Sequence, residues 1–181
     1  MRERTIVDRK GFSLVEMLIV IALLGILVGG IGLSIGLLRS ADTKGAAYDI
    51  KSGLTDLKSR TTGGKDQPYM YLYSISDTYY LDITYTEPTS YVPTTDAKEI
   101  GDSRIQITYG ADKKAIRDEA DGFICFAFQK KDGSFLKDED GKCIKGGKST
   151  CPEEVYISSD GASSYVVHMV PDTGHHYVEE K

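Results

Sequence analysis

An uninterrupted run of 22 residues without a charged side chain, residues 17–38, constrains this chain more than any other feature. A helix needs about 20 apolar residues to cross the hydrocarbon core of a bilayer. The apolar region of an ordinary secretory signal is shorter, about 7–15 residues. The run therefore predicts that residues 12–38 form a membrane-spanning helix.

A single carboxylate, Glu16, stands immediately before this run. A carboxylate at the bilayer centre costs about 2.5–3.5 kcal/mol, and less near the interface, so Glu16 needs a cationic partner. Cleavage between Gly11 and Phe12 would create a cationic amine on Phe12, one helical turn before Glu16. The same amine on a neighbouring copy could also neutralise Glu16, which would couple burial of the charge to assembly.

The segment that holds Glu16, Gly11-Phe12-Ser13-Leu14-Val15-Glu16-Met17-Leu18, resembles the processing site of type IV prepilins and the related pseudopilins. The resemblance implies that a membrane peptidase cleaves after Gly11 and methylates Phe12, and that Glu16 guides subunits into a helical filament. It implies a structural subunit rather than an enzyme. The implied partners are other pilin or pseudopilin subunits, the peptidase, an assembly platform in the inner membrane, and membrane lipid before assembly.

Residues 1–11 are interpreted as a leader with a net charge of +2; the whole chain has a net charge of −5, so the mature part carries −7. A basic segment beside an apolar helix favours a cytoplasmic leader, with the C-terminal part outside and later in an extracellular or periplasmic filament. An ordinary secretory signal or a plain anchor is the alternative. The length of the apolar run argues against the first, and Glu16 argues against the second.

The helix is expected to continue beyond the membrane through residues 39–62, and to end near Arg60. Apolar side chains recur at spacings of three and four, which predicts a stripe that lies on a sheet. These residues are Ala46 or Ala47, Ile50, Leu54 and Leu57.

Four glycines in the apolar half, Gly25, Gly29, Gly32 and Gly36, fall at spacings of four, three and four. Such a small-residue face favours close packing of helices in a membrane. Two alternatives remain: glycine is common in membrane helices, and it also weakens a helix locally.

Residues 63–181 change to a period of two and are rich in tyrosine, which predicts β-strands. A hairpin is expected around Ser76-Asp77-Thr78, and a loop over residues 87–98. His175 and His176 are expected in a tail turn. The predicted fold class is α+β, with a long N-terminal helix on an antiparallel β-sheet domain. The expected strands cover residues 69–75, 79–85, 104–109, 122–128, 134–136, 155–157 and 165–170.

The order of these elements is similar, more weakly, to the minor pseudopilins of the H type. Members of the pilin family often have a proline near the position of Leu33, and this chain has none there. Both features favour a minor, initiating subunit. A major pilin subunit, and a DNA- or surface-binding tip pilin of a competence filament, are the alternatives. A membrane-anchored enzyme is disfavoured, and the resemblance does not distinguish a pilus from a secretion pseudopilus.

Three cysteines, Cys125, Cys143 and Cys151, lie in the part expected outside the membrane, where one disulfide among them is permitted and one thiol is left over. Their spacing is not that of a zinc site.

No catalytic constellation, metal site or cofactor motif is predicted. Residues 138–141 do not fit a calcium loop, and Lys142, Lys145 and Lys148 lack the aromatic platform of a nucleic-acid site, so DNA is not favoured as a partner.

Overall fold

The computed structural model describes residues 13–116, 123–136 and 153–181, without the side chains of residues 28–35. The chain divides into two units, Met1–Gly36 and Leu37–Lys181, and each is considered by itself. Helix α1 (Leu14–Gly63) has 50 residues and contributes to both units. It ends three residues beyond the predicted end at Arg60, and the N–H of Gly64 donates to the carbonyl of Arg60 at 2.8 Å.

The N-terminal unit is helical from Leu14 onward. Within the described part of the chain, no helix combines the length and the apolarity that a membrane crossing needs. The membrane-spanning assignment of residues 12–38 is therefore not confirmed and stays a prediction.

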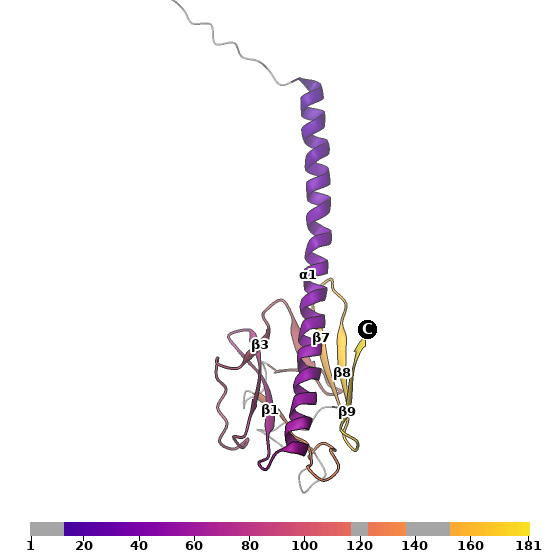
Figure 1. Cartoon of the computed structure of the whole chain (residues 1–181). Helices are drawn as coiled ribbons and strands as arrows, with labels where there is room; N and C mark the ends of the chain where they lie inside the picture. The colour runs from indigo at the N-terminus through magenta and orange to yellow at the C-terminus, as the bar shows by residue number, and fades with distance from the viewer. Residues whose placement is uncertain (1–12, 117–122, 137–152) are drawn as a thin grey trace, which may run out of the picture. The chain divides into compact units, whose positions relative to one another are not determined.

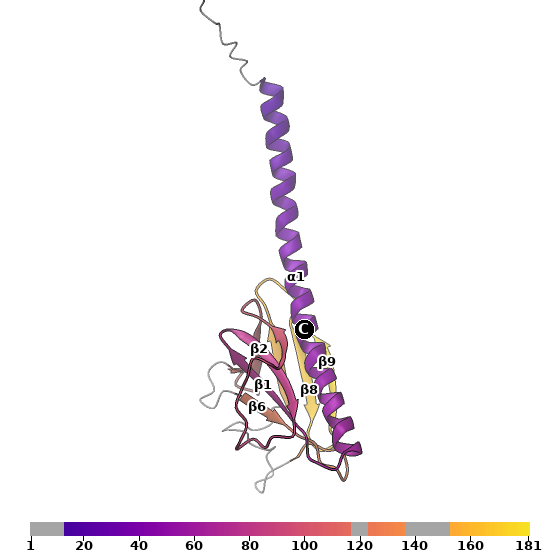
Figure 2. The same cartoon turned by 60° about the vertical axis from the view of Figure 1, so that its left-hand side comes forward.

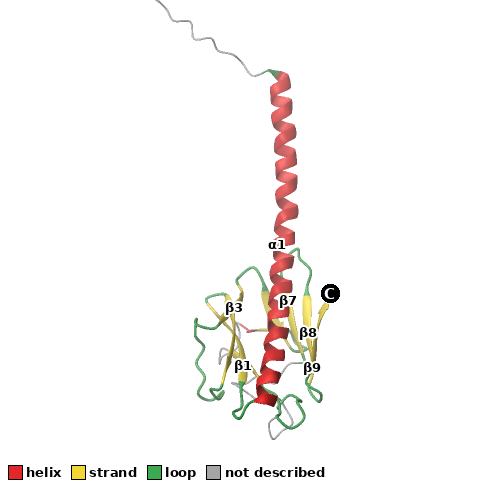
Figure 3. Cartoon of the chain, in the orientation of Figure 1, coloured by secondary structure: helices red, strands yellow, loops and turns green. Residues whose placement is uncertain are grey.

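The second unit contains two antiparallel sheets, which confirms the α+β class and adds a division that the sequence pattern did not indicate (Figures 1 and 3). The four-stranded sheet has the order β3-β2-β1-β6 and the five-stranded sheet the order β5-β4-β7-β8-β9. The strands are β1 (Tyr69–Ile75), β2 (Thr78–Thr84), β3 (Lys98–Gly101), β4 (Gln106–Tyr109), β5 (Lys114–Ala115), β6 (Phe123–Phe126), β7 (Glu154–Ser158), β8 (Tyr165–Val170) and β9 (His175–Glu180).

The predicted apolar stripe of α1 forms one core with both sheets. Ala47, Ile50, Leu54 and Leu57 are fully buried, and Ala46 is 1% exposed. They belong to the same cluster as inward-facing residues of β1, β2 and β6 and of β4, β7 and β8. Figure 2 shows this part of α1 beside β8 and β9. The helix therefore joins the two sheets through a common core.

The four-stranded sheet buries its other face as well. Tyr71, Tyr73, Phe123 and Cys125 form a second cluster there. Tyr91, from the segment between β2 and β3, stacks on Tyr71 with ring centroids 3.6 Å apart and an angle of 3°. The hydroxyls of Tyr71 and Tyr73 each donate at 2.6 Å to a carbonyl of this segment, those of Thr86 and Thr94. These contacts explain why β1 and β6 read as continuous apolar runs.

The predicted tyrosine-rich hairpin is present between β1 and β2, whose pairing runs from Tyr69–Thr84 to Ile75–Thr78. Ser76 and Asp77 have φ angles of 48° and 66°. Two successive residues with positive φ match the right-handed twist of paired strands, as in the favoured two-residue hairpin turns.

Several predicted elements need correction. The segment 134–136 contributes one isolated bridge, Phe128 to Phe135, rather than a strand. The predicted loop 87–98 ends where β3 begins, at Lys98. Neither β3 nor β5 was expected. His175 and His176 lie in β9 and not in a tail turn, because residues 171–174 reverse the chain and pair β9 with β8. The strand 104–109 begins two residues later, at Gln106.

The turn before β9 leads to a testable prediction. Gly174 has a φ of +62°, and a Cβ there would lie 1.9 Å from the carbonyl oxygen of Gly133. Gly161 has a φ of +71°, but a Cβ added there would meet no atom within 4 Å. Positive φ costs an alanine about 1 kcal/mol, and a forced clash adds about 1–3 kcal/mol. We expect Gly174→Ala to lower the free energy of unfolding by more than Gly161→Ala, measured by chemical denaturation; equal losses would contradict the clash.

Candidate functional site

The N-terminal end of α1 is the first candidate site, because it holds the carboxylate that the sequence singled out. Ser13 precedes the helix, and its Oγ accepts from the N–H groups of Val15 and Glu16 at 3.2 and 3.4 Å. Its carbonyl accepts from the N–H of Met17 at 3.1 Å. Ser13 is therefore the N-cap, and Glu16 is the third helical residue, where a carboxylate also interacts favourably with the helix dipole.

Sequence reasoning missed the role of Ser13, although its signal was present. The pattern Ser-x-x-Glu over residues 13–16 is that of a capping box, in which the acid reaches back to the N-cap backbone. This gives Glu16 a second, purely structural interpretation beside the electrostatic one. Any experiment on Glu16 has to separate the two.

The helix around Glu16 presents apolar side chains without cover in the single chain. Leu14 is 82% exposed and Ile26 is 72% exposed. Further exposed apolar side chains are Val15, Met17, Leu18, Ile19, Val20, Ile21, Leu23, Leu24 and Leu27. An apolar surface of this extent is typical of a segment that contacts lipid or other protein.

The predicted glycine face is described only in part. Gly25, Gly29, Gly32 and Gly36 all lie in α1, but residues 28–35 are outside the described side chains. A Cβ at Gly25 would meet nothing within 4 Å. Contacts within the described chain therefore do not require a glycine at this position.

The disulfide predicted among the three cysteines is not confirmed and stays a prediction. Cys125 is buried in β6 and its thiol is free. Cys143 and Cys151 lie outside the described residues, as do the acidic segment 138–141 and the lysines at 142, 145 and 148. Burial raises the pKa of the Cys125 thiol to about 12, although a hydrogen bond with Tyr71 acts in the opposite direction.

The histidines are held by protein groups. His168 lies between two carboxylates, with Nδ1 3.2 Å from Glu154 Oε1 and Nε2 2.8 Å from Glu179 Oε2. His176 Nε2 is 3.0 Å from Thr55 Oγ1, and its Nδ1 is 3.2 Å from the Gly174 carbonyl. Burial lowers the pKa of His176. Among the described residues, no group of three or more His, Cys, Asp or Glu side chains is placed to hold a metal ion.

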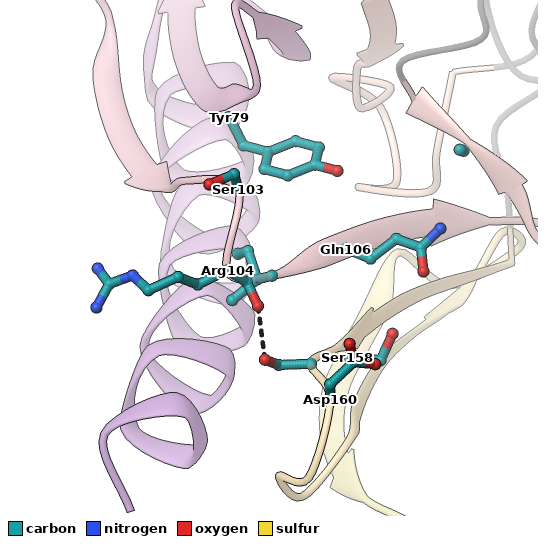
Figure 4. A pocket seen from close by; sticks show the side chains of 9 residues that line it. Tyr79, Ser103, Arg104, Gln106, Ser158 and Asp160 are labelled. Atoms are coloured by element: carbon teal, nitrogen blue, oxygen red, sulfur yellow. Dashed lines mark hydrogen bonds between the residues drawn. The ribbon is translucent and has the colours of Figure 1, made fainter. Parts of the chain in front are cut away.

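A polar cleft of about 310 Å³ lies where Tyr79 of β2, Gln106 of β4 and Ser158 of β7 come together (Figure 4). Ser159 Oγ donates to the carbonyl of Arg104 at 2.5 Å across it. The Arg104 guanidinium points away from the cleft in Figure 4 and pairs with Asp42 at 3.1 Å. The cleft offers hydroxyl and amide groups, and neither histidine nor cysteine is among the described residues that line it.

Comparison with protein families identifies the N-terminal segment. Residues 7–32 match the model of the prokaryotic N-terminal methylation motif. This is the class III signal of the type IV pilin and pseudopilin family, and the match confirms the recognition made from residues 11–18. The motif supports a pilin-like or pseudopilin filament subunit that a prepilin peptidase processes and that assembles with other such subunits. Neither the curated proteins nor the solved structures that were compared gave a match.

The environment of Cys125 predicts slow chemical modification. The thiolate is the reactive form, and a buried thiol whose pKa is raised to about 12 holds little of it at neutral pH. We expect iodoacetamide to label Cys125 in the native chain only slowly at pH 7, faster as the pH rises, and fastest in denaturant. Peptide mapping by mass spectrometry would follow Cys125 separately from the other cysteines. Fast native labelling at pH 7 would contradict the buried site.

Proposed function

We propose that this chain is a structural subunit of a type IV pilus or of a type II secretion-like pseudopilus, made as a prepilin and assembled through its N-terminal helix. The single observation that carries the proposal is Glu16 in the first turn of an exposed apolar helix, inside an N-terminal methylation motif. The chemistry of maturation belongs to the peptidase, which cleaves after Gly11 and methylates Phe12. Residues 1–11 are the leader, and residues 12–38 hold the chain in the membrane before assembly.

The driving force for assembly depends on the environment that surrounds the apolar helix surface before and after assembly. Moving it from lipid to a bundle of similar helices gains little hydrophobic free energy, because lipid tails are as apolar as the side chains. Close approach and pairing of polar groups must therefore decide whether a subunit enters the filament. Gly25, Gly29, Gly32 and Gly36 supply the close approach, and Glu16 with the amine of a neighbouring Phe12 supplies the pairing.

Within this class we propose a minor, initiating subunit. The absence of a proline near Leu33 and the order of the helix and the tyrosine-rich hairpin favour it over a major pilin. A DNA-binding tip subunit has less support, since the mature part is acidic and binding to duplex DNA depends on many cationic contacts.

Maturation gives the first test. Mass spectrometry of the purified protein from its native host should show loss of residues 1–11 and one methyl group on Phe12. The physical reason is that the cationic amine, which Glu16 requires, exists only after cleavage. A Gly11→Ala variant is the control, because it changes only the residue immediately before the proposed cleavage site. A natural product that keeps Met1 would overturn the proposal.

The second test separates charge from helix capping at Glu16. Glu16→Gln retains a side chain that can complete a capping box but loses the charge, whereas Ser13→Ala removes the cap and keeps the charge. If the charge guides assembly, Glu16→Gln should enter the membrane normally and reduce filament incorporation strongly, while Ser13→Ala should cost only about 1 kcal/mol of helix stability.

Incorporation is measured by immunoblotting of sheared filaments against the membrane fraction. Normal incorporation of Glu16→Gln would show that the electrostatic role is wrong. Equal defects in both variants would assign Glu16 to capping instead.

A further inference from the structure

The outer edge of the five-stranded sheet is strand β9, which pairs with β8 and with no other described strand (Figure 1). The N–H of Lys181 donates to the carbonyl of Ser164, just before β8, at 2.8 Å. Hydrogen-bonding direction alternates from one residue to the next along an antiparallel pair, and the β8–β9 pairing is regular over six residues. The N–H and carbonyl groups of His176, Val178 and Glu180 therefore point away from β8.

These main-chain groups have no hydrogen-bond partner in the part of the chain that the structure describes. A row of unpaired N–H and carbonyl groups is a template for a further strand. β9 contains neither a proline nor a bulge, two features that commonly prevent such pairing. By contrast β3, an edge of the four-stranded sheet, has only four residues and a register shift against β2. Of these two edges, β9 is the one that is open to a partner strand.

One inward-facing charge on β9 restricts which partner can pair with it. Val178 packs partly on the core, so Glu180, two residues further on, also has its side chain on the core side of the sheet. An inward-facing charge on an edge strand disfavours pairing with an arbitrary strand. A partner must therefore place a cationic environment opposite Glu180.

The other end of β9 provides such an environment. His176 lies on the same side of the sheet as Glu180, with its Nε2 3.0 Å from Thr55 Oγ1 of α1. Burial lowers the pKa of His176, and the charges of Lys58 and Lys51 lower it further. These two lysines, and not His176 itself, make this end of the strand cationic at neutral pH.

An antiparallel second copy of β9 brings the acidic end of one strand to the cationic end of the other. When the two strands are centred on Val178, each Glu180 lies opposite His176 of the other copy, and Val178 lies opposite Val178. All the free residues are then paired, with two main-chain hydrogen bonds for each pair. A shift of the register by two residues in either direction leaves one of them without a partner in β9. The contact is the same on both copies, as a two-fold dimer requires.

The opposite face of β9 does not counteract this pairing. Its charges next to the edge, Glu179 and Lys181, neutralise each other, with Lys181 Nζ 3.0 Å from Glu179 Oε2. In the same register Glu179 lies opposite Tyr177 of the other copy, and Lys181 lies opposite His175. No carboxylate therefore faces a carboxylate across this edge, and no lysine faces a lysine.

We propose that β9 is an interaction edge that pairs antiparallel with β9 of a second copy of this chain, and so joins two five-stranded sheets into one. Thr43 of α1 donates to Ser163 near the end of β9, and Lys58 donates to Gly174 before its start, so α1 and β9 run in opposite directions. The two-fold axis therefore makes the two α1 helices of a pair antiparallel. Subunits of one helical filament all point the same way, so this pairing would join different filaments. Only that last consequence rests on the proposed function.

The test uses the full chain, unassembled, in a non-ionic detergent, at a low and a high protein concentration. Sedimentation equilibrium measures pairing, and NMR follows amide hydrogen exchange along β9. The amides of His176, Val178 and Glu180 should exchange fast in dilute protein, and about tenfold more slowly once about nine-tenths of the chains are paired. The amides of Tyr177 and Glu179 face β8 and are the internal control, because they should be protected at both concentrations.

Three variants decide whether this edge is the contact. Val178→Pro removes the central free N–H and should abolish pairing, and proline is tolerated on an edge strand where its nitrogen faces solvent. Glu180→Lys places a lysine at each cationic end and should weaken pairing about fivefold or more, because the pair contains this contact twice. Glu99→Lys makes the same change of charge at an exposed position of β3 and should leave pairing unchanged. Melting temperatures in dilute protein check folding, and Glu180→Lys decides alone if Val178→Pro does not fold.

Equal exchange of the three edge amides at both concentrations would overturn the proposal. If they exchange slowly in a chain that sediments as a monomer, a segment of the same chain covers the edge instead. A dimer that persists in both Val178→Pro and Glu180→Lys lies on another surface, such as the apolar part of α1, and would also overturn the proposal. Equal weakening by Glu180→Lys and Glu99→Lys would do the same. A chain that keeps its leader, by contrast, overturns the proposed function and not this pairing.

Discussion

Burial of one helix stripe holds the globular unit together. Ala46, Ala47, Ile50, Leu54 and Leu57 of α1 contribute to a single core with residues of both sheets. No described strand of one sheet pairs with a described strand of the other; the two sheets meet in this core, where the Tyr79 hydroxyl of β2 also accepts from the N–H of Ile107 of β4 at 3.3 Å. Gly53 lies in this stretch, and a Cβ there would meet Met70 Sδ at 2.9 Å. The helix can approach β1 closely because that position has no side chain.

Features that depend on local chemistry were predictable from the sequence. Spacings of three and four indicated the buried stripe of α1, and the alternation around Ser76-Asp77 indicated the β1–β2 hairpin. Residues 11–18 were sufficient to recognise the N-terminal motif, because the resemblance rests on this one contiguous segment and on the position of Glu16 within it. The strand at residues 165–170 agrees with β8 at both ends.

What the sequence did not reveal depends on neighbours distant in the chain. β9 has the sequence His-His-Tyr-Val-Glu-Glu, and it reads as polar because it is an edge strand with only Val178 packed partly on the core. β3 and β5 are short, and their pairing with β2 and β4 supplies what their own sequences lack. The separation into two sheets cannot be read from alternation, since alternation marks the faces of a strand and not its partner.

The aromatic cover of the four-stranded sheet has a consequence for how this surface can change. With Tyr91 stacked over Tyr71 and Phe123 at the edge of both rings, that sheet is closed on both sides, and substitutions in it disturb one core or the other. Thr108 of β4 and Ser164, just before β8, are half-buried and belong to neither apolar cluster. Substitutions at these two positions therefore disturb the architecture less than substitutions in the aromatic cover.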